Sequence, residues 1–246
     1  MGAALIVLAA GYGATAGWLL PRAVYRLSVA PGEPWREGCP RGHRVRGWLG
    51  AARCPVPAAA GRAPHRYGRR AAPLAALVGA LCAVLGAAVG ARPEVVVFAG
   101  LAPVVVLLAL VDRAVHRLPD VLTLPLAAGA VALLGAAAPL PRAGGDWRLA
   151  LLGGGALGAA YLLLHLINPA GMGFGDVKLA LSLGVALGWY GWGVWAAGAF
   201  LGLLYGALYG LTLLLRGSAT REQAFAFGPF MAAGAFTGVL LGGFGA

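Results

Sequence analysis

The stretch Gly-Met-Gly-Phe-Gly-Asp-Val-Lys at residues 171–178 lies between two long apolar segments. It places the carboxylate of Asp176 where a bilayer would otherwise hold hydrocarbon, which is costly unless the group faces a cavity or a partner. The alternating glycines, Gly173 and Gly175 among them, remove side-chain bulk and tolerate positive φ, so that backbone and substrate can approach the carboxylate. The stretch can also be a turn whose Asp caps the next helix. The motif alone leaves both interpretations open.

The composition of the 246-residue chain indicates a membrane protein. Hydrophobic residues make up 60% and charged residues 11%, which is too few charges to cover a soluble surface of this size. The 41 glycines suit close approach of helices in a bilayer. We therefore expect an all-α, polytopic transmembrane bundle of about eight helices. Apolar runs near the ~20 residues that a bilayer core requires lie at roughly 3–21, 73–91, 94–111, 119–139, 149–167, 177–190, 193–215 and 225–244.

The first apolar run, residues 3–21, could be a cleaved signal peptide. No Lys or Arg precedes it, so we interpret it as a transmembrane helix. Residues 22–72 form the only long hydrophilic stretch and are rich in Arg and Pro. The sequence thus divides into residues 1–72, the first helix and a basic loop, and residues 73–246, which hold the remaining spans.

The basic residues are distributed as a topology signal. Eleven of the nineteen Lys and Arg residues fall between Arg22 and Arg70. With this loop in the cytoplasm, sixteen basic residues lie inside and three outside, as the positive-inside rule requires. Both termini then lie outside, and Asp112 and Asp176 both fall at cytoplasmic ends of spans. Attraction to anionic membrane lipid is a secondary effect, and we expect no nucleic-acid partner despite the net charge of +11.

Three of the eight acidic residues stand at or within apolar runs: Asp112, Asp120 and Asp176. Asp120 follows Pro119 and would lie in the first turn of a helix, where the helix dipole favours a carboxylate. A structural role explains it well. Asp112 ends an apolar run, where the dipole opposes a carboxylate unless something else holds it there.

Asp112 and Asp176 on one side of the membrane suggest a dyad that shares a proton. The ionised carboxylate would activate water, and the protonated one would polarise a scissile carbonyl. Rival nucleophiles lack partners. Ser182 and Ser218 have no neighbouring His, and Cys39 with His43 has no matching acid.

The sequence resembles the prepilin leader peptidases, which are aspartic membrane peptidases with a GxGD signature. Residues 173–176 match that signature. The family's other signature resembles Asp112 followed by Leu-Pro-Asp-Val-Leu-Thr at residues 118–123. Its closing element resembles Phe-Gly-Pro-Phe at residues 227–230. The likeness covers essentially the whole chain.

The resemblance implies that Asp112 and Asp176 are the catalytic pair and that Gly173, Gly175, Asp120 and Lys178 are supporting motif residues. Residues 73–246 would be the peptidase domain. The implied reaction removes the short basic leader from pilin-like precursors at the cytoplasmic face of the bacterial plasma membrane. Proteolysis of this kind needs no cofactor.

The basic loop departs from the family pattern. Many relatives carry two CxxC pairs there, thought to bind zinc, and N-methylate the new amino terminus with S-adenosylmethionine. Neither Cys39 nor Cys54 belongs to a CxxC pair. Cys39, His43, Cys54 and His65 offer tetrahedral ligand chemistry at unusual spacing. We assign no metal from the sequence, keep these four as candidates and leave methylation open.

A small transporter or channel that uses intramembrane carboxylates is the rival function. It predicts internal repeats and broken helices near the midplane. The sequence shows no repeat, and both acids lie near one face. Which precursor is cut, and the oligomeric state, stay open.

Smaller motifs have ordinary structural interpretations. The pairs Gly13/Gly17 and Gly234/Gly238 have GxxxG spacing, which predicts internal helix packing, with a dimer contact as the alternative. The aromatic cluster at residues 189–195 is typical of a membrane-interface belt.

Overall fold

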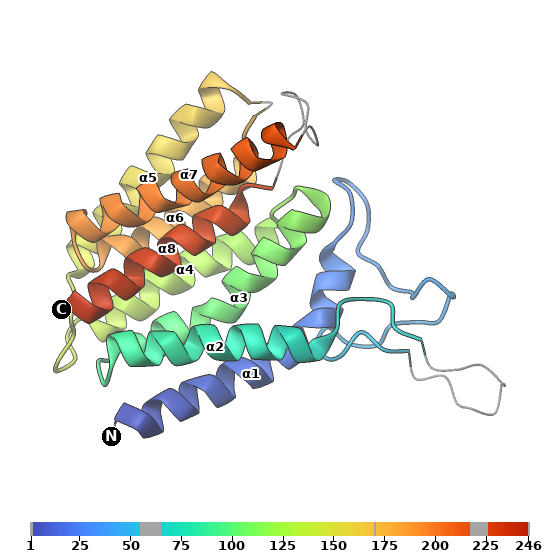
Figure 1. The fold of residues 1–246 in the computed structure, drawn as a ribbon, viewed down its shortest axis with the longest axis horizontal. Coiled ribbons are helices and arrows are strands. Elements are labelled where there is room, and N and C mark those ends of the chain that lie inside the picture. Colours follow the sequence, from blue (N-terminus) through green and yellow to red (C-terminus); the bar gives the residue numbers. More distant parts are fainter. Residues whose placement is uncertain (1, 55–64, 170, 217–225, 246) are drawn as a thin grey trace.

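The computed structural model describes residues 2–54, 65–169, 171–216 and 226–245, which form an all-helical bundle (Figure 1). The helices are α1 (Gly2–Leu27), α2 (Ala71–Val89), α3 (Glu94–Val115), α4 (Asp120–Ala137), α5 (Trp147–Ile167), α6 (Phe174–Gly188), α7 (Trp192–Leu215) and α8 (Gly228–Gly245). The predicted polytopic helical fold is confirmed. Residues 55–64 and 217–225, which contain parts of the predicted first and last cytoplasmic segments, lie outside the described residues.

Seven of the described helices are long and apolar enough to cross a membrane, and α6 is the exception. Its 15 residues span about 22 Å at ~1.5 Å per residue, short of the ~30 Å bilayer core. It nevertheless runs between the two ends of the bundle. Gly175 at its start packs on Leu118, and the carbonyl of Trp189 after its end accepts a hydrogen bond from Asp146 at 2.9 Å. Its apolar run, residues 177–190, is also the shortest of those in the sequence, and most residues of the helix are buried.

The first helix continues six residues past its predicted end and includes Pro21. The reason lies in its last turns. The guanidinium groups of Arg22 and Arg26 bond to backbone carbonyls of the basic loop, those of Arg46 at 2.6 Å and Gly47 at 2.9 Å. The basic side chains that suggested a loop therefore lie on a helix and fasten the loop to it.

Both GxxxG pairs serve internal packing, as predicted. A Cβ on Gly13 would lie 2.5 Å from the carbonyl oxygen of Val78 on α2, so α1 and α2 touch backbone to backbone. Gly234 and Gly238 of α8 approach the backbone of α7 at Gly202 and Gly198 in the same way. Any larger residue at these positions would separate the helices.

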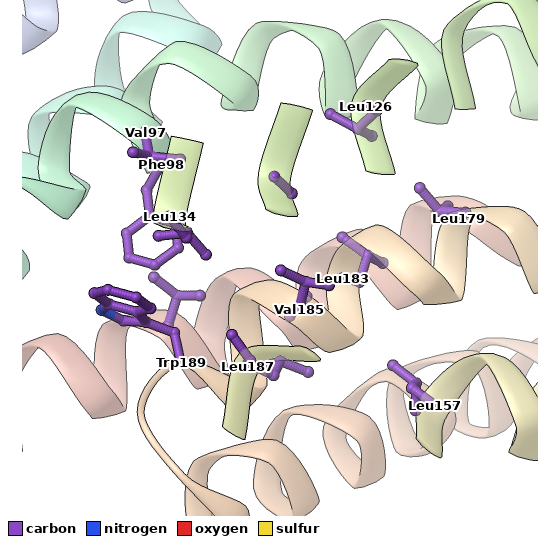
Figure 2. Packing of buried hydrophobic residues seen from close by; sticks show 14 of the residues in the cluster. Val97, Phe98, Leu126, Leu134, Leu157, Leu179, Leu183, Val185, Leu187 and Trp189 are labelled. Carbon is purple, nitrogen blue, oxygen red and sulfur yellow. The ribbon is translucent and has the colours of Figure 1, made fainter. Parts of the chain in front are cut away.

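Trp189 lies in the main core rather than in an interface belt, so that expectation was wrong for this residue. Its side chain is 0% exposed. Figure 2 shows it beside Phe98 of α3 and Leu134 of α4. Trp192, by contrast, is 48% exposed. The tryptophan at the end of α6 thus anchors that helix in the core.

A buried carboxylate ties together the end of the bundle where both chain termini lie (Figure 1). Glu94, which is 0% exposed, accepts hydrogen bonds from the amide of Gly144 at 3.0 Å and the hydroxyl of Tyr190 at 3.4 Å. Nearby, Arg92 donates to the carbonyl of Gly243 at 3.0 Å. These bonds join the turns α2–α3, α4–α5 and α6–α7 and the end of α8. The two aspartates of interest lie at the opposite end.

Candidate active site and loop cluster

Asp112 lies in the last turn of α3 and is 5% exposed. Its Oδ2 accepts a hydrogen bond of 2.9 Å from the backbone amide of Gly228, the first residue of α8. A carboxylate is unfavourable at the end of its own helix, but the positive end of α8 meets it here. A Cβ on Gly228 would lie 2.8 Å from Oδ2, so only glycine fits this contact without a shift.

Asp176 lies in the first turn of α6 and is 8% exposed. Its amide donates to the carbonyl of Gly173 at 3.0 Å. Gly173 itself is the N-cap residue, and no side chain caps the helix. The interpretation of Asp176 as a simple N-cap is therefore wrong. Like Asp112, it sits at the positive end of a helix, where a negative charge is stabilised.

The fold brings the two aspartates together. Asp112 of α3 lies within electrostatic range of Asp176 of α6. Two buried carboxyl groups from different helices thus share one end of the bundle, each beside a helix N-terminus. Their assignment as a catalytic pair stays a prediction, which the proposal below takes up.

The glycines of the GxGD stretch act by size and not by unusual backbone angles. Gly173 has a φ of −70°, and neither it nor Gly175 has positive φ, contrary to expectation. A Cβ on Gly175 would lie 2.8 Å from the Cβ of Leu118, so this glycine lets the segment after Asp112 pack on α6. A Cβ on Gly173 would lie 3.6 Å from Oδ2 of Asp176, in ordinary van der Waals contact with the carboxylate.

Lys178 and Asp120 form a salt bridge of 2.6 Å between the starts of α6 and α4. The lysine also lies 4.9 Å from the ring centre of Phe174. Asp120 begins α4, as the sequence predicted, with Pro119 as the N-cap residue. The bridge fixes α6 against the helix that follows Asp112. Asp120 is therefore both a helix-start residue and half of an interhelical pair.

Two residues of α5 belong to this region, and neither was assigned to the site from the sequence. The Nδ1 of His165 hydrogen-bonds the carbonyl of Met172 at 2.7 Å, and its ring lies 5.6 Å from that of Phe174. Tyr161, one turn earlier, is 4% exposed and lies within electrostatic range of Asp176. An imidazole and a phenol four residues apart share a helix face, and this spacing was the available signal.

The basic loop gathers the four candidate metal ligands Cys39, His43, Cys54 and His65. Their ligand atoms all lie within 4.8 Å of one another. Backbone pairing accounts for this. The backbone amide of Cys39 donates to the carbonyl of His43 at 2.8 Å across one turn. The backbone amide of Cys54 donates to the carbonyl of His65 at 3.0 Å across the other. The second pair joins residues eleven positions apart, so the four candidates named from the sequence do come together.

The chemistry of this donor set fits a zinc ion. Two thiols and two imidazoles within this distance match the donor set of Cys₂His₂ zinc sites. Both ring nitrogens of His65 are buried and make no hydrogen bond to the described residues. Burial by itself raises the pKa of the Cys39 thiol, but hydrogen bonds from the backbone at Arg41 and from His43 outweigh burial and lower the pKa to about 6.

Comparisons with known proteins point to one family. The model of the type IV leader peptidase family matches residues 99–215, which include both aspartates. The prepilin leader peptidase/N-methyltransferase of Burkholderia pseudomallei (strain 1026b) is 33% identical over 213 residues, 81% of this chain and 65% of the relative. That of Bacillus subtilis (strain 168) is 35% identical over 97 residues, 39% of this chain and 38% of the relative. No solved structure matches the chain.

The match extends beyond the segment of the family model. The prepilin leader peptidase/N-methyltransferase of Pseudomonas putida is 33% identical over 208 residues, 82% of this chain and 70% of the relative. The chain spans just under two thirds of the Burkholderia protein's length. Because this likeness extends over most of its length, the chain belongs to the type IV leader peptidase family.

Proposed function

We propose that the chain is a membrane aspartic endopeptidase that removes the leader from type IV pilin-like precursors. The observation that carries the proposal is the pair Asp112 and Asp176, both buried, from different helices, and held at one end of the bundle. The relatives named prepilin leader peptidase support the substrate class. We further propose that residues 73–246 form the peptidase domain.

In this mechanism the two carboxyl groups share one proton. The ionised one takes a proton from water as the hydroxide oxygen attacks the scissile carbonyl, and the protonated one hydrogen-bonds the carbonyl oxygen. When the tetrahedral intermediate collapses, a carboxyl proton passes to the leaving amine. The amide of Gly228 holds the carboxylate of Asp112 throughout. The salt bridge between Lys178 and Asp120 holds the start of α6.

The proposed location is the plasma membrane of a bacterium, with the active site at the cytoplasmic face. The basic loop and the aspartates lie at the same end of the helices, since Arg117 at the end of α3 bonds to the carbonyl of Ala30 at 3.3 Å. By the positive-inside rule this end is cytoplasmic. The leader of the precursor would be reached from the cytoplasm.

The cluster of Cys39, His43, Cys54 and His65 would hold one zinc ion. Such an ion would supply a structural cross-link between the two turns of the loop and would take no part in the proteolysis. The names of the relatives also include N-methyltransferase. We propose methylation of the new amino terminus, with S-adenosylmethionine as methyl donor, as the second activity to test.

Co-expression with a pilin precursor tests the peptidase, with the intact mass of the pilin as the readout. We expect loss of the leader with the wild type and with Asp146→Asn, a control at the opposite end of the bundle. We expect no cleavage with Asp112→Asn or Asp176→Asn, although both variants insert. Full processing by either variant would refute the proposal, and an added methyl mass would report the second activity. Uncut precursor beside inserted wild type would favour the transport function.

A further inference from the structure

A wedge-shaped space separates α2 from α8, and α3 forms the floor of this space. The two helices meet at their outer ends, where a Cβ on Gly243 would lie 3.1 Å from the backbone of Ala88. They diverge toward the opposite end, and the second half of α3 rises between them (Figure 1). A cavity of about 380 Å³ fills this wedge. Its lining runs along α3 from Val97 to Arg113.

The lining is apolar except for three side chains, and two of these are satisfied within their own helices. The hydroxyl of Ser182 donates to the carbonyl of Leu179 at 2.8 Å, and that of Thr237 to the carbonyl of Ala233 at 2.9 Å. The third is Arg113, which is exposed and has no ion pair or side-chain hydrogen bond with any described residue. The wedge therefore offers a long apolar wall with one cation at its wide end.

The size of the cavity limits which molecules can bind in it. The seventeen residues from Val97 to Arg113 cover about 24 Å along α3, at ~1.5 Å per residue step. A helix of that length and ~10 Å diameter would occupy roughly 1,900 Å³, which is more than this groove encloses. A single hydrocarbon chain is thin enough to fit.

We propose that the wedge binds one phospholipid of the cytoplasmic leaflet, with an acyl chain between α2 and α8 and its phosphate at Arg113. Basic residues at the cytoplasmic mouth of a cleft between helices are a known way to recognise lipid headgroups. Arg113 directly follows Asp112, so the headgroup would lie beside the entrance to the proposed active site.

Native mass spectrometry of the full chain, purified in mild detergent, tests this by counting phospholipids retained per chain. We expect about one for the wild type, a roughly five-fold lower affinity for Arg113→Gln, and loss of the lipid in Ala109→Phe, which fills the wedge one turn from Arg113. Matched controls are Arg148→Gln at the opposite end and Ala128→Phe on α4, neither of which lines the wedge. Both should retain the lipid.

Equal lipid retention by the wild type and Ala109→Phe would overturn the proposal, as would a wild type that retains none. If Ala109→Phe keeps its lipid but binds the pilin precursor more weakly, the wedge serves a peptide and the lipid assignment is wrong. Cleavage by the wild type is measured separately, so failure here does not depend on the peptidase assignment.

Discussion

The amide of Gly228 and the carboxylate of Asp112 are joined by a 2.9 Å hydrogen bond across 116 residues of chain. The bond places the N-terminus of α8 against a carboxylate at the C-terminus of α3. Glycine permits the approach, because a Cβ would stand 2.8 Å from Oδ2. The closing sequence element thus contributes to the site through its backbone.

Gly228→Ala should therefore displace the carboxylate of Asp112. A misplacement near 1 Å costs on the order of a hundredfold in rate, so we expect precursor cleavage to fall by about that factor while the protein still inserts. Gly155→Ala is the control, because a Cβ there meets nothing within 4 Å. Normal cleavage by Gly228→Ala would show that this contact does not position the carboxylate.

Breaking the Lys178–Asp120 bridge should have a smaller effect. Asp120 is 62% exposed, and exposed pairs contribute no more than about 1 kcal/mol. We expect Lys178→Gln and Asp120→Asn each to lower kcat/KM a few-fold and the double variant to lose no more than either alone. Activity measured for the exchanged pair Asp120→Lys with Lys178→Asp should recover in part. Additive losses would mean that the two side chains act independently.

His165 should act through its bond to the carbonyl of Met172, which holds the loop before Asp176. Loss of one such bond costs about 1 kcal/mol, so His165→Leu should lower kcat roughly five-fold. His165→Asn keeps a donor near the position of Nδ1 and should restore most of the rate. Equal activity of the Leu and Asn variants would assign His165 to packing alone.

The loop cluster should bind one zinc ion per chain, measured by elemental analysis of the purified protein. Cys39→Ser and His65→Gln should each lose the metal, and a chelator should do the same to the wild type and lower the unfolding temperature. Cys82→Ser is the control, because Cys82 is fully buried against α1 and is no part of the cluster. A metal-free wild type prepared without chelator would contradict the assignment.

Glu94 should stabilise the opposite end of the bundle. Glu94→Ala leaves the amide of Gly144 and the hydroxyl of Tyr190 without an acceptor, at about 1–3 kcal/mol per buried group. The unfolding temperature in detergent should fall by several degrees. Glu94→Gln keeps an acceptor oxygen, so its unfolding temperature should fall less. An unchanged temperature for the alanine variant would show that these bonds contribute little.

The helices were predictable because a bilayer demands long apolar runs, and each run became a helix whose ends, except the end of α1, lie within four residues of the predicted ones. The end of α1 was missed because Arg22 and Arg26 look like loop residues until their carbonyl partners are known. The two aspartates stood out as charges among apolar residues. The Gly228 amide did not, since almost every residue has a backbone N–H and only the fold brings this one close to Asp112. The pairing of Cys54 with His65 was hidden for the same reason.

The packing of α5 on α6 fixes how far Asp176 lies from the end of α5. His165 lies beside Phe174, so Asp176, two residues into α6, is level with about residue 163 of α5. From there α5 continues four residues to Ile167, about 6 Å at ~1.5 Å per residue. A peptide bond at the level where α5 ends would miss Asp176 by that distance. About two residues of extended chain, at ~3.3 Å each, would span that distance in a substrate of the proposed peptidase.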